Sequence, residues 1–175
     1  LCPFSLSYEL VGNSSTEYIA TRKNVMERFV KKGDTEVEST ETYIKYGSQY
    51  QDILRAAQET EIVLRGELNG QGVGSSGNKL NPALKEAANI RFFGIDRLRG
   101  GITYKLPHAE FVAKAQALGI ETVPIIFEKE FSSRGELLAT CEAYFAQHVI
   151  EGIVVRTPDS KFSAKIMNNY YDSKK

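Results

Sequence analysis

The last part of the chain holds a carboxylate and a lysine beside two apolar runs. Glu151 precedes Gly152 and the branched residues "IVV", and Lys165 lies inside the apolar stretch from Phe162 to Met167. One interpretation is a buried strand, a polar turn and a surface lysine. The other is a carboxylate and an amine that two strands hold to act on phosphates. An amine balances phosphate charge, and a carboxylate is a hard oxygen ligand that suits Mg²⁺.

Bulk composition limits the partners of the chain. Its 175 residues suit one domain with a real core or two small lobes. Lys+Arg and Asp+Glu both number 22, so any nucleic-acid surface must be a local patch. Cys2 and Cys141 lack metal-ligand spacing, which indicates free thiols in the cytoplasm or another reducing intracellular compartment. No apolar run is long enough to span a bilayer, so we expect no membrane partner.

Alternating and branched residues predict the strands that must position these side chains. A polar turn separates the first two strands, which should form a hairpin. The stretch after Gly119 also reads as a strand, with Pro124 near its start. The expected strands cover residues 3–10, 17–24, 61–68, 89–98, 120–131, 152–156 and 162–167.

Helical periodicity predicts three helices between these strands. They cover residues 46–60, with Ser48 as the N-cap, 106–119, ending at Gly119, and 132–147, capped by Ser132 or Ser133. Residues 31–45 are polar and charged and predict little regular structure, and the glycine-rich residues 69–78 predict a loop. The mixture indicates an α+β fold with antiparallel hairpins and outer helices.

Four short stretches follow one another in an order typical of one protein family. They are "ATRKN" (20–24), "LRGELNGQGVG" (64–74), "IRFFGID" (90–96) and "EGIVVRT" with "FSAKIMNN" (151–169). Together they resemble the nucleotidyltransferase domain of ATP-dependent polynucleotide ligases, above all the RNA ligases of the phage-type second family and their bacterial relatives. The resemblance extends over nearly the whole chain. It implies the mixed, mostly antiparallel nucleotidyltransferase fold of ligases and capping enzymes (the ATP-grasp-like DNA ligase fold), with ATP between two sheets.

The resemblance also implies a lysine nucleophile in a Lys-x-Asp-Gly motif, which does not occur in residues 1–175. In the family this motif lies just upstream of a strand like "CPFSLSYEL". We therefore expect it immediately before Leu1, and we interpret residues 1–175 as an adenylyltransferase domain truncated at its N-terminus. The alternative is a domain that has lost the lysine.

The closing strands carry two residues to which the resemblance gives a role. It assigns Lys165 to the α-phosphate of ATP and Glu151 to the metal ion, directly or through water. Strand alternation places Lys165 with Ser163 on the face opposite to Phe162 and Ala164. Many family members have a second lysine two residues after the first, where this chain has Met167. Lys165 should therefore carry more of the role alone.

The resemblance assigns the remaining nucleotide contacts to the earlier motifs. It implies that Arg22 contacts the nucleotide and the 3′-OH end, and that Glu67 accepts hydrogen bonds from the ribose hydroxyls. The family stacks an aromatic side chain on the adenine where this chain has Ile95, so Phe93 on the same strand face should share that role. Asp96 could orient Arg22 or cap a turn. Each of these residues also has an ordinary structural interpretation.

The implied reaction has three steps. A lysine attacks ATP to give lysyl-AMP and pyrophosphate, AMP moves to a 5′-phosphate, and a 3′-OH then displaces AMP. The implied cofactors are ATP and Mg²⁺, with Mn²⁺ as a substitute, the implied partner is RNA with 5′-phosphate and 3′-OH ends, and the implied role is RNA repair without an obligate protein partner. The alternatives are a non-catalytic nucleotide- or nucleic-acid-binding domain, a DNA ligase and a capping guanylyltransferase.

Overall fold

A computed structural model of the protein describes residues 5–10, 17–21, 24–73 and 78–171. The chain divides into two compact units. One comprises the described residues of Asn69–Ala88 and Pro124–Lys175, and the other those of Pro3–Leu68 and Asn89–Val123. Within the described ranges, no helix has both the length and the apolar character needed to cross a membrane.

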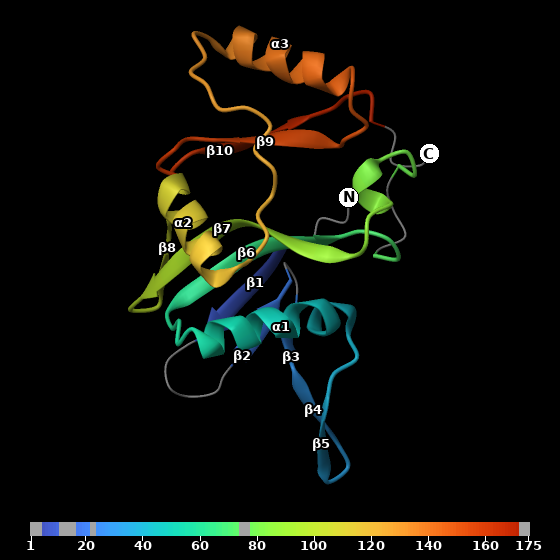
Figure 1. Ribbon diagram of the computed structural model, residues 1–175, viewed down its shortest axis with the longest axis vertical. Helices are drawn as coiled ribbons and strands as arrows, with labels where there is room; N and C mark the ends of the chain where they lie inside the picture. Colours follow the sequence, from blue (N-terminus) through green and yellow to red (C-terminus); the bar gives the residue numbers. More distant parts are fainter. Residues whose placement is uncertain (1–4, 11–16, 22–23, 74–77, 172–175) are drawn as a thin grey trace. The chain divides into compact units, whose positions relative to one another are not determined.

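The larger unit is built on a six-stranded sheet with the order β3-β2-β1-β6-β7-β8 (Figure 1). Its first two strands form the predicted antiparallel hairpin, with Leu10 opposite Glu17. In β6, Leu64, Gly66 and Leu68 are buried, whereas the alternate residues are half-buried, as period-2 patterning predicts. The strands are β1 (Ser5–Leu10), β2 (Glu17–Ala20), β3 (Val25–Glu27), β6 (Ile62–Asn69), β7 (Asn89–Arg99) and β8 (Ile102–Lys105).

Helix α1 (Thr42–Ala56) packs against this sheet through an apolar stripe that includes Tyr50 and Leu54. The Tyr50 ring meets Phe92 edge to face, with 4.8 Å between the ring centroids. Its hydroxyl donates a hydrogen bond to Asn89 Oδ1 at 3.1 Å. Helix α2 (His108–Leu118) also contacts β7 and ends at Gly119, which has the left-handed φ of 66° that such a helix end requires. The sequence predicted this end correctly.

The smaller unit places helix α3 (Arg134–Phe145) against a two-stranded antiparallel sheet of β9 (Gly152–Arg156) and β10 (Ser163–Met167) (Figure 1). Ser133 caps α3, because its Oγ accepts a hydrogen bond from the Glu136 backbone amide at 3.2 Å. A short 3-10 helix, η1 (Pro82–Leu84), belongs to the same unit. The core of the unit comprises Cys141, Phe145 and Ile153, with Ile150, Val155 and Ile166 packed against them.

Two sequence predictions in the first half of the chain were wrong. Ser48 does not cap α1, because the helix begins six positions earlier at Thr42 and Glu41 occupies the N-cap. Residues 31–45 were expected to have little structure, but they include parts of β4 (Phe29–Lys32) and β5 (Thr35–Glu38). These strands form a hairpin through Gly33, whose φ is 65°. Charged side chains on both strands obscured the alternation of apolar and polar residues that indicates a strand. The Gly-Asp pair between them was nevertheless a signal for a hairpin turn.

The predicted strand over residues 120–131 was also wrong. It is reduced to a single parallel bridge between Thr122 and Phe92. Pro124 has no backbone N–H to continue a ladder. By contrast, β8 was not predicted, although Gly100 and Gly101, with φ of 56° and 79°, supply the two-glycine turn that favours a hairpin.

Arg28 joins the β4–β5 hairpin to α1. Its guanidinium donates hydrogen bonds to Glu38 Oε1 at 2.8 Å and to Asp52 Oδ1 at 2.6 Å, and its side chain is only 15% exposed. The hydrogen bond from Arg28 lowers the pKa of the Asp52 carboxyl below its usual value. The ionised form of Asp52 is therefore the one that the folded state favours.

We expect Asp52→Asn to lower the free energy of unfolding at about pH 7 by roughly 1 kcal/mol, since the pair is partly solvated. Because the folded-state pKa of Asp52 is lowered, its contribution is present above the unfolded pKa and is lost as pH falls through the folded value. Urea unfolding should therefore show a larger stability difference between the two proteins at about pH 7 than at about pH 3. Glu130→Gln, at an exposed position, is the control. An equal loss at both pH values would contradict this account.

Candidate active site

The structure brings Lys165 and Glu151 together, as expected from the interpretation in which two strands hold a carboxylate and an amine. The Lys165 Nζ atom donates a hydrogen bond to Glu151 Oε1 at 2.5 Å. Lys165 lies in β10 directly opposite Val154 of β9, and Glu151 immediately precedes β9. The two side chains are 43% and 22% exposed, so both groups remain open to a ligand.

Lys165 lies on the face of the β9–β10 sheet that does not pack against α3. Ile153 and Ile166 are in register and belong to the core, so the alternate residues project from the other face. On that face Val154 is 57% exposed and Met167 is 49% exposed. The predicted alternation is confirmed, and Lys165 stands between exposed apolar side chains that a ligand could cover.

Asn168 fixes the backbone at Glu151 and at the residue before it through two hydrogen bonds. Its backbone N–H donates to the Glu151 carbonyl oxygen at 2.9 Å, and its side-chain amide donates to the Ile150 carbonyl oxygen at 3.0 Å. Asn168 is only 7% exposed. Sequence reasoning did not single it out, although a buried asparagine directly after a strand is a typical residue for fixing a turn. Asn168 is therefore a positioning residue for Glu151.

Gly152 is required by the neighbouring strand. A Cβ atom on this residue would lie 2.5 Å from the Ile166 carbonyl oxygen, which is far inside van der Waals contact. The observed close approach is to the β10 backbone, and it brings the start of β9, beside Glu151, against β10.

Glu67 lies near the end of β6 in the other unit, on its half-buried face. The preceding residue, Gly66, has no space for a side chain, because a Cβ atom would lie 2.8 Å from Ile90 Cγ2 and 2.9 Å from Phe92 Cδ1. The glycine thus leaves room for the side chains of Ile90 and Phe92 on that face, and Glu67 projects from the opposite face of β6. A carboxylate there offers only acceptors, which suits a ribose diol.

The two candidates for covering the base differ in accessibility. Ile95 is 1% exposed, whereas Phe93 is half-buried. Phe92, the residue before Phe93, is fully buried against Tyr50. Of the two predicted residues, Phe93 therefore has the more accessible side chain, and it is the aromatic one.

Asp96 makes an ion pair that the sequence did not predict. Its Oδ2 atom accepts hydrogen bonds from Arg65 Nε at 3.0 Å and pairs with Arg65 Nη2 at 2.9 Å. Asp96 is 5% exposed, so the pair fixes adjacent strands β6 and β7 near Glu67. Arg22, the residue that Asp96 was expected to orient, lies outside the described residues.

The donor groups suit a metal ion shared with a ligand. Within the described ranges, no three His, Cys, Asp or Glu side chains gather closely enough to form a protein-only metal site. Mg²⁺ and Mn²⁺ are commonly held by one or two carboxylates together with water and substrate phosphate oxygens. Glu151 fits that arrangement, because its carboxylate is partly exposed and lies beside a cationic group that attracts phosphate.

Comparison with known proteins identifies the family of the chain. The sequence matches the family described as RNA ligase over residues 4–167, nearly its full length. The chain belongs to the RNA ligase family. No curated protein matches the sequence significantly.

Solved structures of an RNA ligase from Naegleria gruberi share this fold. A mutant of that ligase with AMP and manganese is 18% identical with a TM-score of 0.66, and the match covers 97% of this chain and 48% of the other. A mutant without ligand is 18% identical with a TM-score of 0.69 and covers 97% and 47%. A mutant with ATP and manganese is 17% identical with a TM-score of 0.67 and covers the same shares. This RNA ligase chain therefore spans about half the length of the proteins it matches.

Proposed function

We propose that this chain is the adenylyltransferase part of an ATP-dependent RNA ligase with the nucleotidyltransferase fold. The amine of a lysine outside residues 1–175 attacks the α-phosphorus of ATP, a P–N bond forms and pyrophosphate leaves. AMP then passes to the 5′-phosphate of one RNA end. The 3′-OH of another RNA end attacks that phosphate, a phosphodiester forms and AMP leaves.

The pairing of Lys165 with Glu151 is the observation that best supports this proposal. The two groups neutralise each other at a distance of 2.5 Å, beside exposed apolar side chains. When the triphosphate arrives, its oxygens compete with the carboxylate for Lys165, and Glu151 becomes available to a divalent cation. Lys165 then balances the charge that develops on the α-phosphate as pyrophosphate departs. A bound Mg²⁺ or Mn²⁺ would supply further charge neutralisation and hold the phosphates in place.

The other predicted residues orient the nucleotide. Glu67 accepts hydrogen bonds from the ribose hydroxyls, and Phe93, together with Ile95 on the same strand face, covers one face of the adenine. The Arg65–Asp96 ion pair keeps the strands that carry these groups in register. Arg22 contacts the nucleotide and the 3′-OH end in this proposal.

Nucleotide choice is one expected outcome. We expect the full-length protein to label itself with radioactive ATP and to react much less with GTP, because the motifs resemble those of ligases more than those of capping enzymes. The measurement is the initial rate of covalent labelling with each nucleotide at the same concentration. Equal labelling with the two nucleotides would contradict the ligase assignment, and a preference for GTP would favour a capping guanylyltransferase.

End joining separates an RNA ligase from its alternatives. We expect the full-length protein to join RNA carrying a 5′-phosphate to RNA carrying a 3′-OH when ATP and Mg²⁺ are present. The same strands with a 5′-OH should not be joined, because they cannot accept AMP. DNA strands of the same sequence serve as the second control. A protein that binds RNA without joining it would match the non-catalytic alternative, and a preference for DNA would indicate a DNA ligase.

A further inference from the structure

The end of the β7–β8 hairpin carries a basic and aromatic surface that none of the proposed roles uses. In this antiparallel pair Arg97 lies opposite Tyr104 and Arg99 lies opposite Ile102. Residues that face each other across two strands project to the same side of the sheet. We call these four residues the hairpin face. Tyr104 is 53% exposed and Ile102 is 59% exposed, so cationic and apolar side chains share one open surface.

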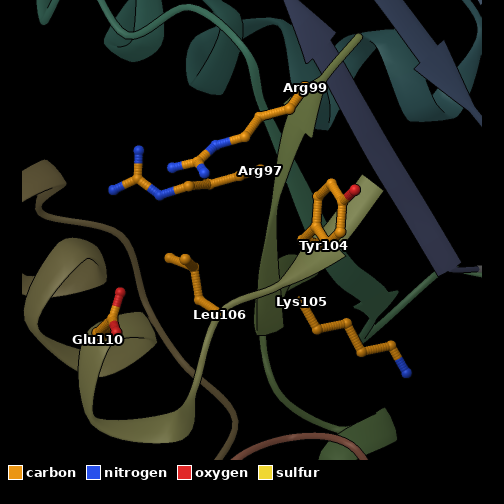
Figure 2. A pocket seen from close by; sticks show the side chains of 6 residues that line it. All are labelled: Arg97, Arg99, Tyr104, Lys105, Leu106 and Glu110. Atoms are coloured by element: carbon orange, nitrogen blue, oxygen red, sulfur yellow. The ribbon is translucent and has the colours of Figure 1, made fainter. Parts of the chain in front are cut away.

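The two arginine side chains of the hairpin face point in the same direction. Figure 2 shows the Arg97 and Arg99 side chains running out from β7 in the same direction, whereas Lys105 points away from them. They border an open pocket of about 420 Å³, which is also lined by Tyr104, Lys105, Leu106 and Glu110. Glu110 is the one carboxylate among these lining residues, against three basic side chains.

Arg97 and Arg99 differ from other arginines of this sheet in their lack of partners among the described residues. Within the part of the chain that the structure describes, neither guanidinium has a hydrogen bond or an ion pair. Arg65, in contrast, forms an ion pair with Asp96. From Arg97 to Ala109 the sequence holds three Lys or Arg residues and no acidic one, although the net charge of the whole chain is zero. This is the kind of local patch that a nucleic-acid surface requires in a neutral protein.

The spacing of the patch fits an extended polyanion. Alternate residues of a strand are about 6.6 Å apart, which is comparable with the distance between successive phosphates of an extended single strand. A guanidinium bonds phosphate oxygens through a planar fork of N–H donors. The exposed Tyr104, on the neighbouring strand opposite Arg97, offers a ring on which a base can stack, as single-strand-binding surfaces do.

We propose that the hairpin face binds single-stranded RNA, with Arg97 and Arg99 on successive backbone phosphates and Tyr104 under a base. The proposal rests on the proposed ligase function and adds to it a surface for the RNA strand. The contacts are to phosphates and to the flat face of a base, so binding should depend strongly on salt and little on sequence.

The test measures RNA binding and self-adenylylation in the same full-length variants. A short, fluorescently labelled single-stranded RNA is titrated at several salt concentrations, and covalent labelling with radioactive ATP is measured without RNA. We expect Arg97→Gln with Arg99→Gln to weaken RNA binding at least tenfold. The slope of log affinity against log salt should become shallower by about 1.4, or roughly 0.7 for each phosphate that an arginine no longer neutralises. Self-adenylylation should be unchanged.

Matched variants identify the residues that bind RNA. Lys31→Gln with Lys32→Gln removes the same charge from exposed positions of β4 and should leave RNA affinity within about twofold of wild type. Tyr104→Ala should weaken binding about fivefold or more, whereas Tyr104→Phe should keep most of it, because the ring and not the hydroxyl stacks on the base. If the double arginine variant showed no thermal unfolding transition, the two single variants would serve for the same comparison.

The outcomes distinguish this inference from the proposed function. Unchanged RNA affinity and salt slope in the arginine variant, with normal self-adenylylation, would overturn the role of the hairpin face alone. An equal loss of affinity in the Lys31 and Lys32 variant would also overturn it, because the effect would then reflect net charge. Failure of the wild-type protein to form a covalent adenylate would overturn the proposed function, while RNA binding would still report on the hairpin face.

Discussion

Lys165→Ala should slow self-adenylylation by two to three orders of magnitude. Lys165 is the one lysine of β10, at a place where related ligases often have two, so no second amine on that strand replaces it. A single oriented charge at the site of developing negative charge is worth roughly 3–4 kcal/mol of transition-state stabilisation. The measurement is the single-turnover rate of covalent labelling with ATP and Mg²⁺ in the full-length protein.

Three further variants define the role of Lys165. Lys165→Arg should restore activity only in part, since a guanidinium is wider and its fork meets phosphate differently. Met167→Lys should be tolerated, because Met167 is 49% exposed on the same strand face as Lys165. Lys161→Ala is the matched control, since its side chain is 86% exposed in the preceding turn. A Lys165→Ala enzyme within about threefold of wild type would mean that Lys165 is an ordinary surface lysine.

Glu151→Ala should abolish detectable lysyl-AMP formation and leave the protein folded. The Glu151 carboxylate is the candidate for holding the divalent cation, and without it the triphosphate would lack one of its fixed counter-charges. The fold should survive, because Asn168 bonds the backbone of Glu151 and not its side chain. Covalent labelling and a thermal melt of the same preparation give the two readouts.

A metal titration separates the two roles that Glu151 could have. Glu151 pairs with Lys165, so its loss could act through the lysine alone. If Glu151 holds the cation, Glu151→Gln should raise the Mn²⁺ or Mg²⁺ concentration needed for half-maximal labelling, whereas Lys165→Ala should leave that concentration nearly unchanged. Equal metal requirements in wild type and Glu151→Gln would show that Glu151 acts only as a partner of Lys165. Unchanged labelling by Glu151→Ala would remove it from the site.

Local chemistry made some elements predictable. Helix α2 ends where Gly119 can adopt a left-handed conformation, and α3 begins where Ser133 can cap it. The alternation of residues in β10 correctly predicted that Lys165 and Ser163 lie on the face opposite to Ala164. In each case a few neighbouring residues decide the outcome, so the sequence alone contains the necessary information.

Other features depend on contacts between distant residues and could not be predicted. The pairing of Arg65 with Asp96 requires that β6 and β7 be neighbours, and the sequence does not state which strands are adjacent. The need for Gly152 arises from the approach of the Ile166 carbonyl, fourteen positions away. Pro124 was judged compatible with a strand that its missing N–H in fact cuts short.

We propose that this member of the RNA ligase family works through a covalent adenylate. The most direct test is to incubate the full-length protein with Mg²⁺ and ATP radiolabelled at the α-phosphate, to remove free nucleotide, and then to add RNA with a 5′-phosphate. We expect radioactive AMP to be bound covalently to the protein and to move to the RNA 5′ end after the RNA is added. A protein that acquires no covalent label, or whose label never passes to RNA, would contradict it.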